Sequence, residues 1–177
     1  MNEWSNFLPW FGVIALIFVF YKNAWVSKQD PGDEKMQLIA SHIAKGAMAF
    51  LKAEYKLLAF FVIAASIALA VISYIVPTTD ILIVVAFIFG AFFSALAGNM
   101  GMKIATKSNV RTTQAASSSL AEGLSVSFKA GAVTGMLVAG FALLSVAAYY
   151  FILINSGNFE GRAIVAPLVS LGFGASL

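Results

Sequence analysis

Residues 98–113, GNMGMKIATKSNVRTT, combine two glycines with three cations and lie between two long apolar stretches. The stretch over residues 81–102 leads into this run, and the stretch over residues 130–154 follows it. Each stretch is long enough to cross the roughly 30 Å hydrocarbon core of a bilayer, which takes about 20 helical residues. We therefore expect the run to connect two membrane-spanning helices. This pattern predicts a polytopic, all-α membrane protein.

The composition of the whole chain agrees with a membrane protein. Hydrophobic residues make up 60% of the 177 residues and charged residues only 11%. A soluble domain is typically about a quarter charged. Because cysteine is absent, the chain has no disulfide framework, no thiolate nucleophile and no cysteine-based zinc site.

Four complete helices and the start of a fifth are predicted, all within one transmembrane domain over residues 1–177. Their expected bounds are about 4–25, 34–76, 81–106, 112–154 and 163–177. The fifth stretch is shorter than a full span, so we expect the sequence to stop within a helix, as the N-terminal fragment of a larger protein.

The distribution of cations predicts the orientation. Ten of the eleven Lys and Arg residues follow the first or the third span: Lys22, Lys28, Lys35, Lys45, Lys52 and Lys56, then Lys103, Lys107, Arg111 and Lys129. The positive-inside rule assigns that side to the cytoplasm and the N-terminus to the outside. The chain is thus predicted to be an integral, multi-pass protein, in the cell membrane if the source is prokaryotic.

The connection after the first span is predicted to contain a helix. Asp30 is expected at the N-cap, Pro31 at the first helical position, and Asp33 in the first turn; a metal-binding role for these acids is the alternative. Apolar residues then share one face: Met36, Ile39, Ile43, Ala47, Phe50 and Leu51. Lys35, His42, Lys45, Lys52 and Lys56 occupy the opposite face. We expect a continuous helical rod that runs into the second span; a separate helix lying on anionic lipid is the alternative.

Glu54 breaks this apolar face near the membrane border. An unpaired buried carboxylate is costly, so we expect an ion pair with Lys103, Arg111 or Lys129. A carboxylate that bends into the headgroup region is the alternative. Lys129 is expected at the cytoplasmic boundary, because a long uncharged stretch follows it; an intramembrane functional cation is the other interpretation.

The fourth helix is predicted to begin at Arg111-Thr112-Thr113, where hydroxyls could cap it. Small residues recur every four positions in the third and fourth spans, a spacing that lets helices pack closely in a bilayer. These predicted packing positions are Gly90, Ser94, Gly98, Gly131 and Gly135.

The chain itself carries no pattern of catalysis. His42 is the single histidine, no phosphate-binding P-loop is present, and no base accompanies Ser117, Ser118 or Ser119. The eight acids are scattered apart from the predicted cap. We predict no catalytic, cofactor-binding or metal-binding residue within these 177 residues.

Several segments in order resemble the membrane-bound, ion-translocating inorganic pyrophosphatases. They are the run 98–113, residues 46–56 (GAMAFLKAEYK) at the second-helix entry, residues 124–133 (LSVSFKAGAV) in the fourth helix and residues 172–177 (GFGASL) at the start of the fifth. The resemblance implies an N-terminal part of a larger polytopic enzyme that hydrolyses pyrophosphate in the cytoplasm and exports H⁺ or Na⁺.

The resemblance also implies partners and cofactors. It implies a homodimer, contact with membrane lipid and with the rest of the same polypeptide, pyrophosphate as substrate, and no nucleic acid. Mg²⁺ is the implied cofactor, with ligands outside this chain, and a K⁺ requirement is left open. Lys103, Arg111 and Lys129, with Glu54 as counter-charge, are candidates for holding the helix ends in register.

Two other classes fit the pattern less well. One is a stand-alone membrane scaffold or assembly protein. The other is a repeat unit of a secondary transporter, which needs polar residues near mid-membrane; Ser66, Ser94 and Thr134 are weak candidates.

Overall fold

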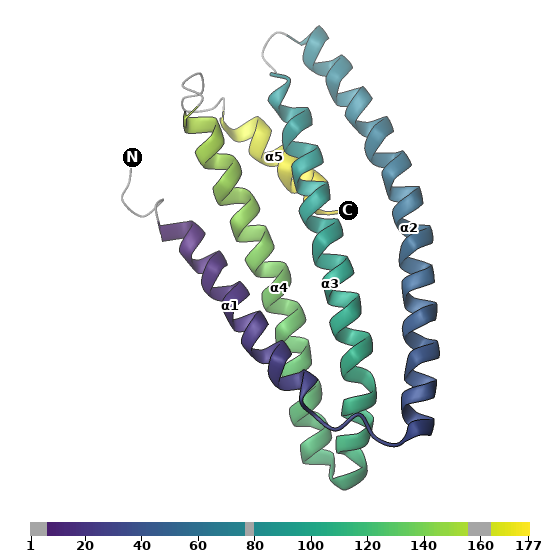
Figure 1. Cartoon of the computed structure of the whole chain (residues 1–177). Coiled ribbons are helices and arrows are strands. Elements are labelled where there is room, and N and C mark those ends of the chain that lie inside the picture. Colours follow the sequence, from purple (N-terminus) through teal and green to yellow (C-terminus); the bar gives the residue numbers. More distant parts are fainter. Residues whose placement is uncertain (1–6, 77–79, 156–163) are drawn as a thin grey trace. The chain divides into compact units, whose positions relative to one another are not determined.

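The computed structural model describes residues 7–76, 80–155 and 164–177, and within them every regular element is a helix. The five helices are α1 (Leu8–Ser27), α2 (Glu34–Ile75), α3 (Leu82–Ser118), α4 (Leu120–Asn155) and α5 (Val165–Ala175) (Figure 1). The first four are long and apolar enough to cross a membrane. This confirms the all-α membrane fold. The expected start of the first helix at residue 4 lies outside the described residues.

The run 98–113 is helical throughout, which corrects the prediction that it forms a connector. Helix α3 continues through the run and ends only at Ser118. The run lacks proline, and its Thr106 and Thr113 hydroxyls donate to carbonyls three or four residues earlier in the helix, those of Met102, Lys103 and Asn109. The drop in apolarity after Met102 therefore marks no end to the helix.

The turn between α3 and α4 centres on Ser119, not on residues 107–111. The Ser119 hydroxyl accepts a hydrogen bond of 3.2 Å from the Glu122 amide, so Ser119 caps α4, and the predicted cap at Arg111–Thr113 is wrong. The two helices approach closely beside this turn. A Cβ on Gly123 would lie 2.7 Å from the Cβ of Ala116, so glycine is what the geometry accommodates there.

Helix α2 begins at Glu34, which confirms the expected bound and corrects the placement of Pro31 at the first helical position. The Asp33 carboxylate accepts a 2.7 Å hydrogen bond from the Met36 amide and is the cap. The Asp30 carboxylate instead accepts from the Gly32 amide at 2.9 Å. Gly32 has a φ of 78°, which is a left-handed conformation. The right-handed helix therefore cannot extend toward the N-terminus through Gly32. The predicted continuous rod is present: 42 residues without a break, or about 63 Å.

The face of α2 that lines a groove against α3 overlaps only in part with the apolar face that was predicted. Leu51 of the predicted face is buried, but the groove is lined by Gln37, Ala40, Ser41, Ala44 and Met48. Ile39, Ile43 and Phe50 are about half exposed or more, at 52%, 48% and 61%. The packed face is rotated by roughly a quarter turn, because small residues there allow the closer helix approach.

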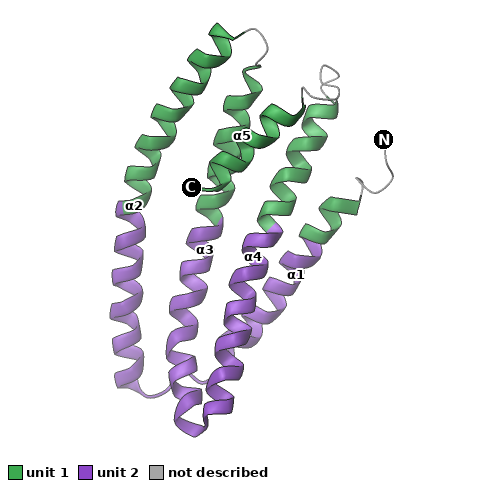
Figure 2. Ribbon diagram, turned by 180° about the vertical axis from the view of Figure 1, so that it is seen from behind, with its two compact units in different colours: residues 1–12, 54–96, 141–177 green, residues 13–53, 97–140 purple. Residues whose placement is uncertain are grey.

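The chain divides into two compact units (Figure 2). Unit 1 comprises residues 1–12, 54–96 and 141–177, and unit 2 comprises residues 13–53 and 97–140. Helices α1 to α4 each contribute to both units. Nine of the eleven Lys and Arg residues belong to unit 2. Unit 1 is therefore the apolar unit and unit 2 the cationic one.

The core of unit 1 joins α3, α4 and α5. Ala86, Tyr149, Leu153 and Leu171 form a buried cluster. The Tyr149 hydroxyl donates to the Leu82 carbonyl at 2.6 Å, and the Ser170 hydroxyl donates to the Ile83 carbonyl at 2.7 Å. These side chains reach backbone carbonyls near the start of α3. Hydroxyl groups in an apolar setting need such partners, so the bonds fix how the three helices meet.

Two glycines let α3 and α5 approach backbone to backbone. A Cβ on Gly90 would overlap the Leu171 carbonyl oxygen, and one on Gly174 would overlap the Phe87 carbonyl oxygen. By contrast, a Cβ on Gly131 or Gly135 would meet nothing within 4 Å in this chain. The packing role predicted for these last two glycines stays a prediction.

Candidate functional site

Three cations of unit 2 lie along one side of α3. Lys103, Lys107 and Arg111 follow one another at intervals of four residues, a spacing that places side chains next to each other on a helix. We refer to these three residues as the cation stripe. Lys103 and Arg111 are candidates predicted from the sequence, and the continuous helix adds Lys107 between them.

The cation stripe is attached to the last residue of α1. The Lys107 ammonium donates to the Ser27 hydroxyl at 2.6 Å, and the Arg111 guanidinium donates to the Ser27 carbonyl oxygen at 3.4 Å. The same guanidinium donates to the Lys107 carbonyl at 2.8 Å. A helix end carries unsatisfied carbonyls and partial negative charge, which cations stabilise. Two members of the stripe therefore hold the end of α1 against α3.

A groove of about 480 Å³ runs beside the stripe, between α3 and the first half of α2. Its α3 side consists of the stripe with Thr106 and Val110. Its α2 side consists of Pro31 before the helix and then Gln37, Ala40, Ser41, Ala44 and Met48. The α3 wall thus carries three cations, whereas the residues that line the α2 wall are uncharged.

The charge of the stripe is not balanced by carboxylates within unit 2. Among the described residues of that unit, no acid forms an ion pair with Lys103, Lys107 or Arg111. Asp30 is directed elsewhere: one of its carboxylate oxygens accepts from Gln114 at 3.1 Å and the other from Gly32. The Nε of Arg111 is buried without a hydrogen-bond partner in the described chain. The groove is therefore a place of net positive charge.

Lys129 has an aromatic partner that sequence reasoning missed. Its ammonium lies 3.8 Å from the centre of the Trp25 ring, which is within the range of a cation–π interaction. Trp25 lies near the end of α1 and Lys129 on α4. The two residues are far apart in the sequence, and no sequence signature links them.

Glu54 and its predicted cation partners belong to different units. Glu54 is exposed and lies in unit 1, whereas Lys103, Arg111 and Lys129 lie in unit 2. The ion pair proposed from the sequence stays a prediction.

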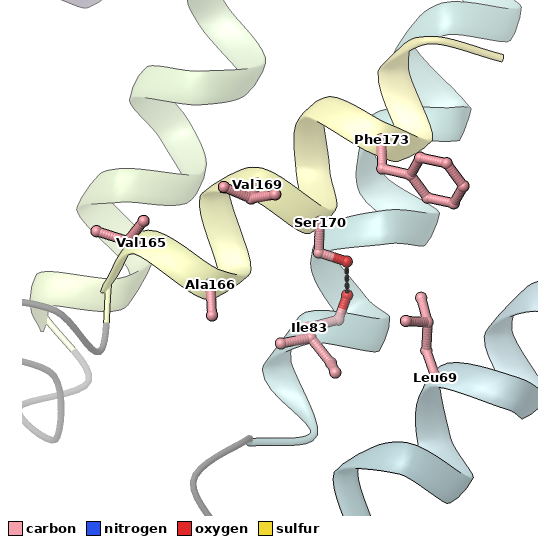
Figure 3. Close-up of a pocket in the computed structure, with 7 residues that line it drawn as sticks. All are labelled: Leu69, Ile83, Val165, Ala166, Val169, Ser170 and Phe173. Carbon is pink, nitrogen blue, oxygen red and sulfur yellow. Dashed lines mark hydrogen bonds between the residues drawn. The ribbon is translucent and has the colours of Figure 1, made fainter.

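Unit 1 contains an apolar groove of about 790 Å³ (Figure 3). It is lined by Leu69 of α2, Ile83 of α3 and, from α5, Val165, Ala166, Val169, Ser170 and Phe173. The Ser170 hydroxyl is engaged with the Ile83 carbonyl, as the dashed line in Figure 3 shows. Across the described parts of the chain, no three His, Cys, Asp or Glu residues are grouped so as to hold a metal ion.

Four membrane-length helices define the class: an integral, multi-pass membrane protein. Residues 13–177 match the family model described as inorganic H⁺ pyrophosphatase, and the chain belongs to that family.

Named relatives agree with this family and differ in the ion. A K⁺-insensitive pyrophosphate-energized proton pump of Pyrobaculum aerophilum is 40% identical over 94% of this chain, and a second such pump, of Moorella thermoacetica, is 39% identical over 96%. A Clostridium tetani protein that is provisionally named a K⁺-stimulated pyrophosphate-energized sodium pump is 48% identical over 71% of the chain. The chain spans only 18% to 24% of the length of these relatives.

Proposed function

We propose that this chain is the N-terminal portion of a pump that couples cytoplasmic pyrophosphate hydrolysis to the export of H⁺ or Na⁺. The observation that carries this proposal is the family match over residues 13–177, together with relatives that are named as such pumps. The enzyme would be a membrane-bound inorganic pyrophosphatase. Its substrate would be pyrophosphate, and a second copy of the same polypeptide would complete a homodimer.

Within that pump, these helices would form a supporting part without catalytic residues. Several polar groups that the structure describes join one helix to another. Tyr55 donates to the Ala95 carbonyl at 2.5 Å, Tyr149 and Ser170 donate to carbonyls of α3, and the cation stripe holds the end of α1. Such contacts favour a structural role, in which the segment packs against the rest of the polypeptide and against lipid.

Mg²⁺ would be the cofactor, since hydrolysis of pyrophosphate needs neutralisation of its charge. The described residues do not fit a Mg²⁺ site, because no group of carboxylates converges among them. As the family resemblance implies, we propose that the Mg²⁺ ligands belong to other parts of the polypeptide, and we derive no catalytic step here. The relatives' names include both K⁺-stimulated and K⁺-insensitive pumps, so a K⁺ requirement must be measured.

The test uses inside-out vesicles that contain the full-length polypeptide. Adding Mg²⁺ and pyrophosphate should release phosphate and drive ion uptake, and chelating Mg²⁺ should stop both. Acidification that a protonophore abolishes would identify H⁺ as the ion, whereas Na⁺ uptake that survives the protonophore would identify Na⁺. Repeating the assay with and without K⁺ settles the K⁺ requirement. Vesicles that hydrolyse no pyrophosphate would refute the proposal.

A further inference from the structure

We propose that the groove beside the cation stripe binds a phosphate-bearing anion, either the headgroup of an anionic phospholipid or free phosphate. The groove has a volume of about 480 Å³, and Lys103, Lys107 and Arg111 line one of its walls. This inference concerns unit 2 alone and does not depend on ion pumping.

The donors that face an incoming anion are available. The structure gives the Lys103 ammonium no acceptor among the described residues of unit 2, and Lys107 uses one of its three N–H donors, on Ser27. Arg111 is already anchored to two carbonyls, but its buried Nε lacks a partner. Lys103 and Lys107 are therefore the primary ligands. Their β-carbons are separated by about 5–6 Å on the helix, so both ammoniums can reach one phosphate group.

The opposite wall leaves room for the anion without repelling it. Its residues on α2 are Gln37, Ala40, Ser41, Ala44 and Met48, none of which is acidic. The carboxylate of Asp30, which precedes the groove residue Pro31, accepts hydrogen bonds from Gln114 and Gly32. A bound anion would offset the mutual repulsion of cations four residues apart, which otherwise destabilises a helix.

Lys103 lies at a depth that two sources of phosphate can reach. Lys103 comes directly after the apolar residues 81–102, which as a helix measure about 33 Å, close to the hydrocarbon thickness. Lys107 then lies about 6 Å farther along α3. Lipid headgroups and dissolved anions both occur at this depth, and the chemistry that recognises them is the same.

The experiment measures binding of two probes to the full-length polypeptide in neutral detergent. Phosphatidylglycerol retained per chain is counted by native mass spectrometry. Inorganic phosphate is titrated against chloride at equal ionic strength, with the thermal midpoint as readout. A cation near an anionic surface contributes about fivefold in affinity. We expect Lys103→Gln to weaken binding of the effective probe about fivefold, and Lys103→Gln with Lys107→Gln about thirtyfold.

The matched control removes the same charge elsewhere in unit 2. Lys45 and Lys52 are exposed on α2 and do not line the groove, so Lys45→Gln with Lys52→Gln should change binding less than twofold. Lys103→Arg should retain binding. Lys103 has no partner in unit 2, so Lys103→Gln should not lower the thermal midpoint measured without anion. An unchanged or higher midpoint would exclude misfolding as the cause of weaker anion binding.

Each outcome decides the proposal. If the groove variants, but not the control variant, lose phosphatidylglycerol retention, the proposal is supported and the source is lipid. If the groove variants, but not the control variant, lose the phosphate-dependent shift in thermal midpoint, the proposal is supported and the source is a free anion. Equal losses in the groove and control variants would show diffuse charge attraction, and binding of neither probe by the unaltered polypeptide would show an empty groove; either result overturns the proposal.

Discussion

Replacing Gly90 by alanine tests whether α3 and α5 meet backbone to backbone. Ordinary contacts to a Cβ begin near 3.4 Å, but a Cβ on Gly90 would lie 2.8 Å from the Ala175 nitrogen and nearer still to the Leu171 carbonyl oxygen. Both obstacles are backbone atoms of α5, so no side chain can rotate away and the helix itself must shift.

The expected destabilisation follows from two opposing terms. Overpacking of a well-packed site costs about 1–3 kcal/mol. Alanine is favoured over glycine within a helix by about 0.5–1 kcal/mol, which offsets part of this cost. We expect Gly90→Ala to lower the free energy of unfolding by about 1–2 kcal/mol. For a chain of this size, each kcal/mol corresponds to about 2–4 °C in the thermal midpoint.

Gly131→Ala is the matched control, because it adds the same methyl group to a helix where nothing lies within 4 Å. Only the helix-propensity term applies there, so the thermal midpoint should stay constant or rise. Both variants are purified in detergent and unfolded while helicity is followed by circular dichroism. Our reasoning about the α3–α5 contact fails if Gly90→Ala is as stable as Gly131→Ala.

Three further substitutions test single hydrogen bonds by the same thermal measurement. Tyr149→Phe removes the 2.6 Å bond to the Leu82 carbonyl and should cost about 1 kcal/mol; an unchanged midpoint would mean that the bond contributes nothing. Ser119→Ala removes the cap of α4 and should also cost about 1 kcal/mol, whereas Ser117→Ala, in the last turn of α3, should have a smaller effect. Asp33→Ala removes the cap of α2 with a similar loss, and Asp33→Asn should restore most of it; failure of that rescue would argue against capping.

Helix existence could be predicted from this sequence because apolar stretches of membrane length are unmistakable. Several helix ends were also predicted to within one residue: the expected range 34–76, the start at 81 and the end at 154 compare with Glu34–Ile75, Leu82 and Asn155. The end of α3 and the start of α4 could not be predicted, because hydropathy reports where a helix leaves the bilayer and not where it stops. Residues 103–118 are polar yet contain no proline, so α3 continues through them. The true turn did carry a local signal, since Ser119 followed three residues later by Glu122 matches a capping box.

The candidate site was predictable only in part. The cations of α3 could be recognised by type and spacing, but their partner on α1 is the hydroxyl and carbonyl of Ser27, and neither has a sequence signature. Part of the packed face of α2 was missed for a related reason. Small residues such as Ala40 and Ala44 carry weak hydropathy, yet they determine how closely α3 can approach.

The unbroken course of α3 to Ser118 has a practical consequence for mapping which side of the membrane each segment occupies. Trypsin cleaves after lysine and arginine, but Lys103, Lys107 and Arg111 lie within a continuous helix. Proteases cut most readily at exposed turns, so resistance at these three residues would not show that they are shielded by the bilayer. A cleavage site or epitope inserted between Ser118 and Ser119 would report on that side directly, where one inserted at residues 107–111 would interrupt the helix.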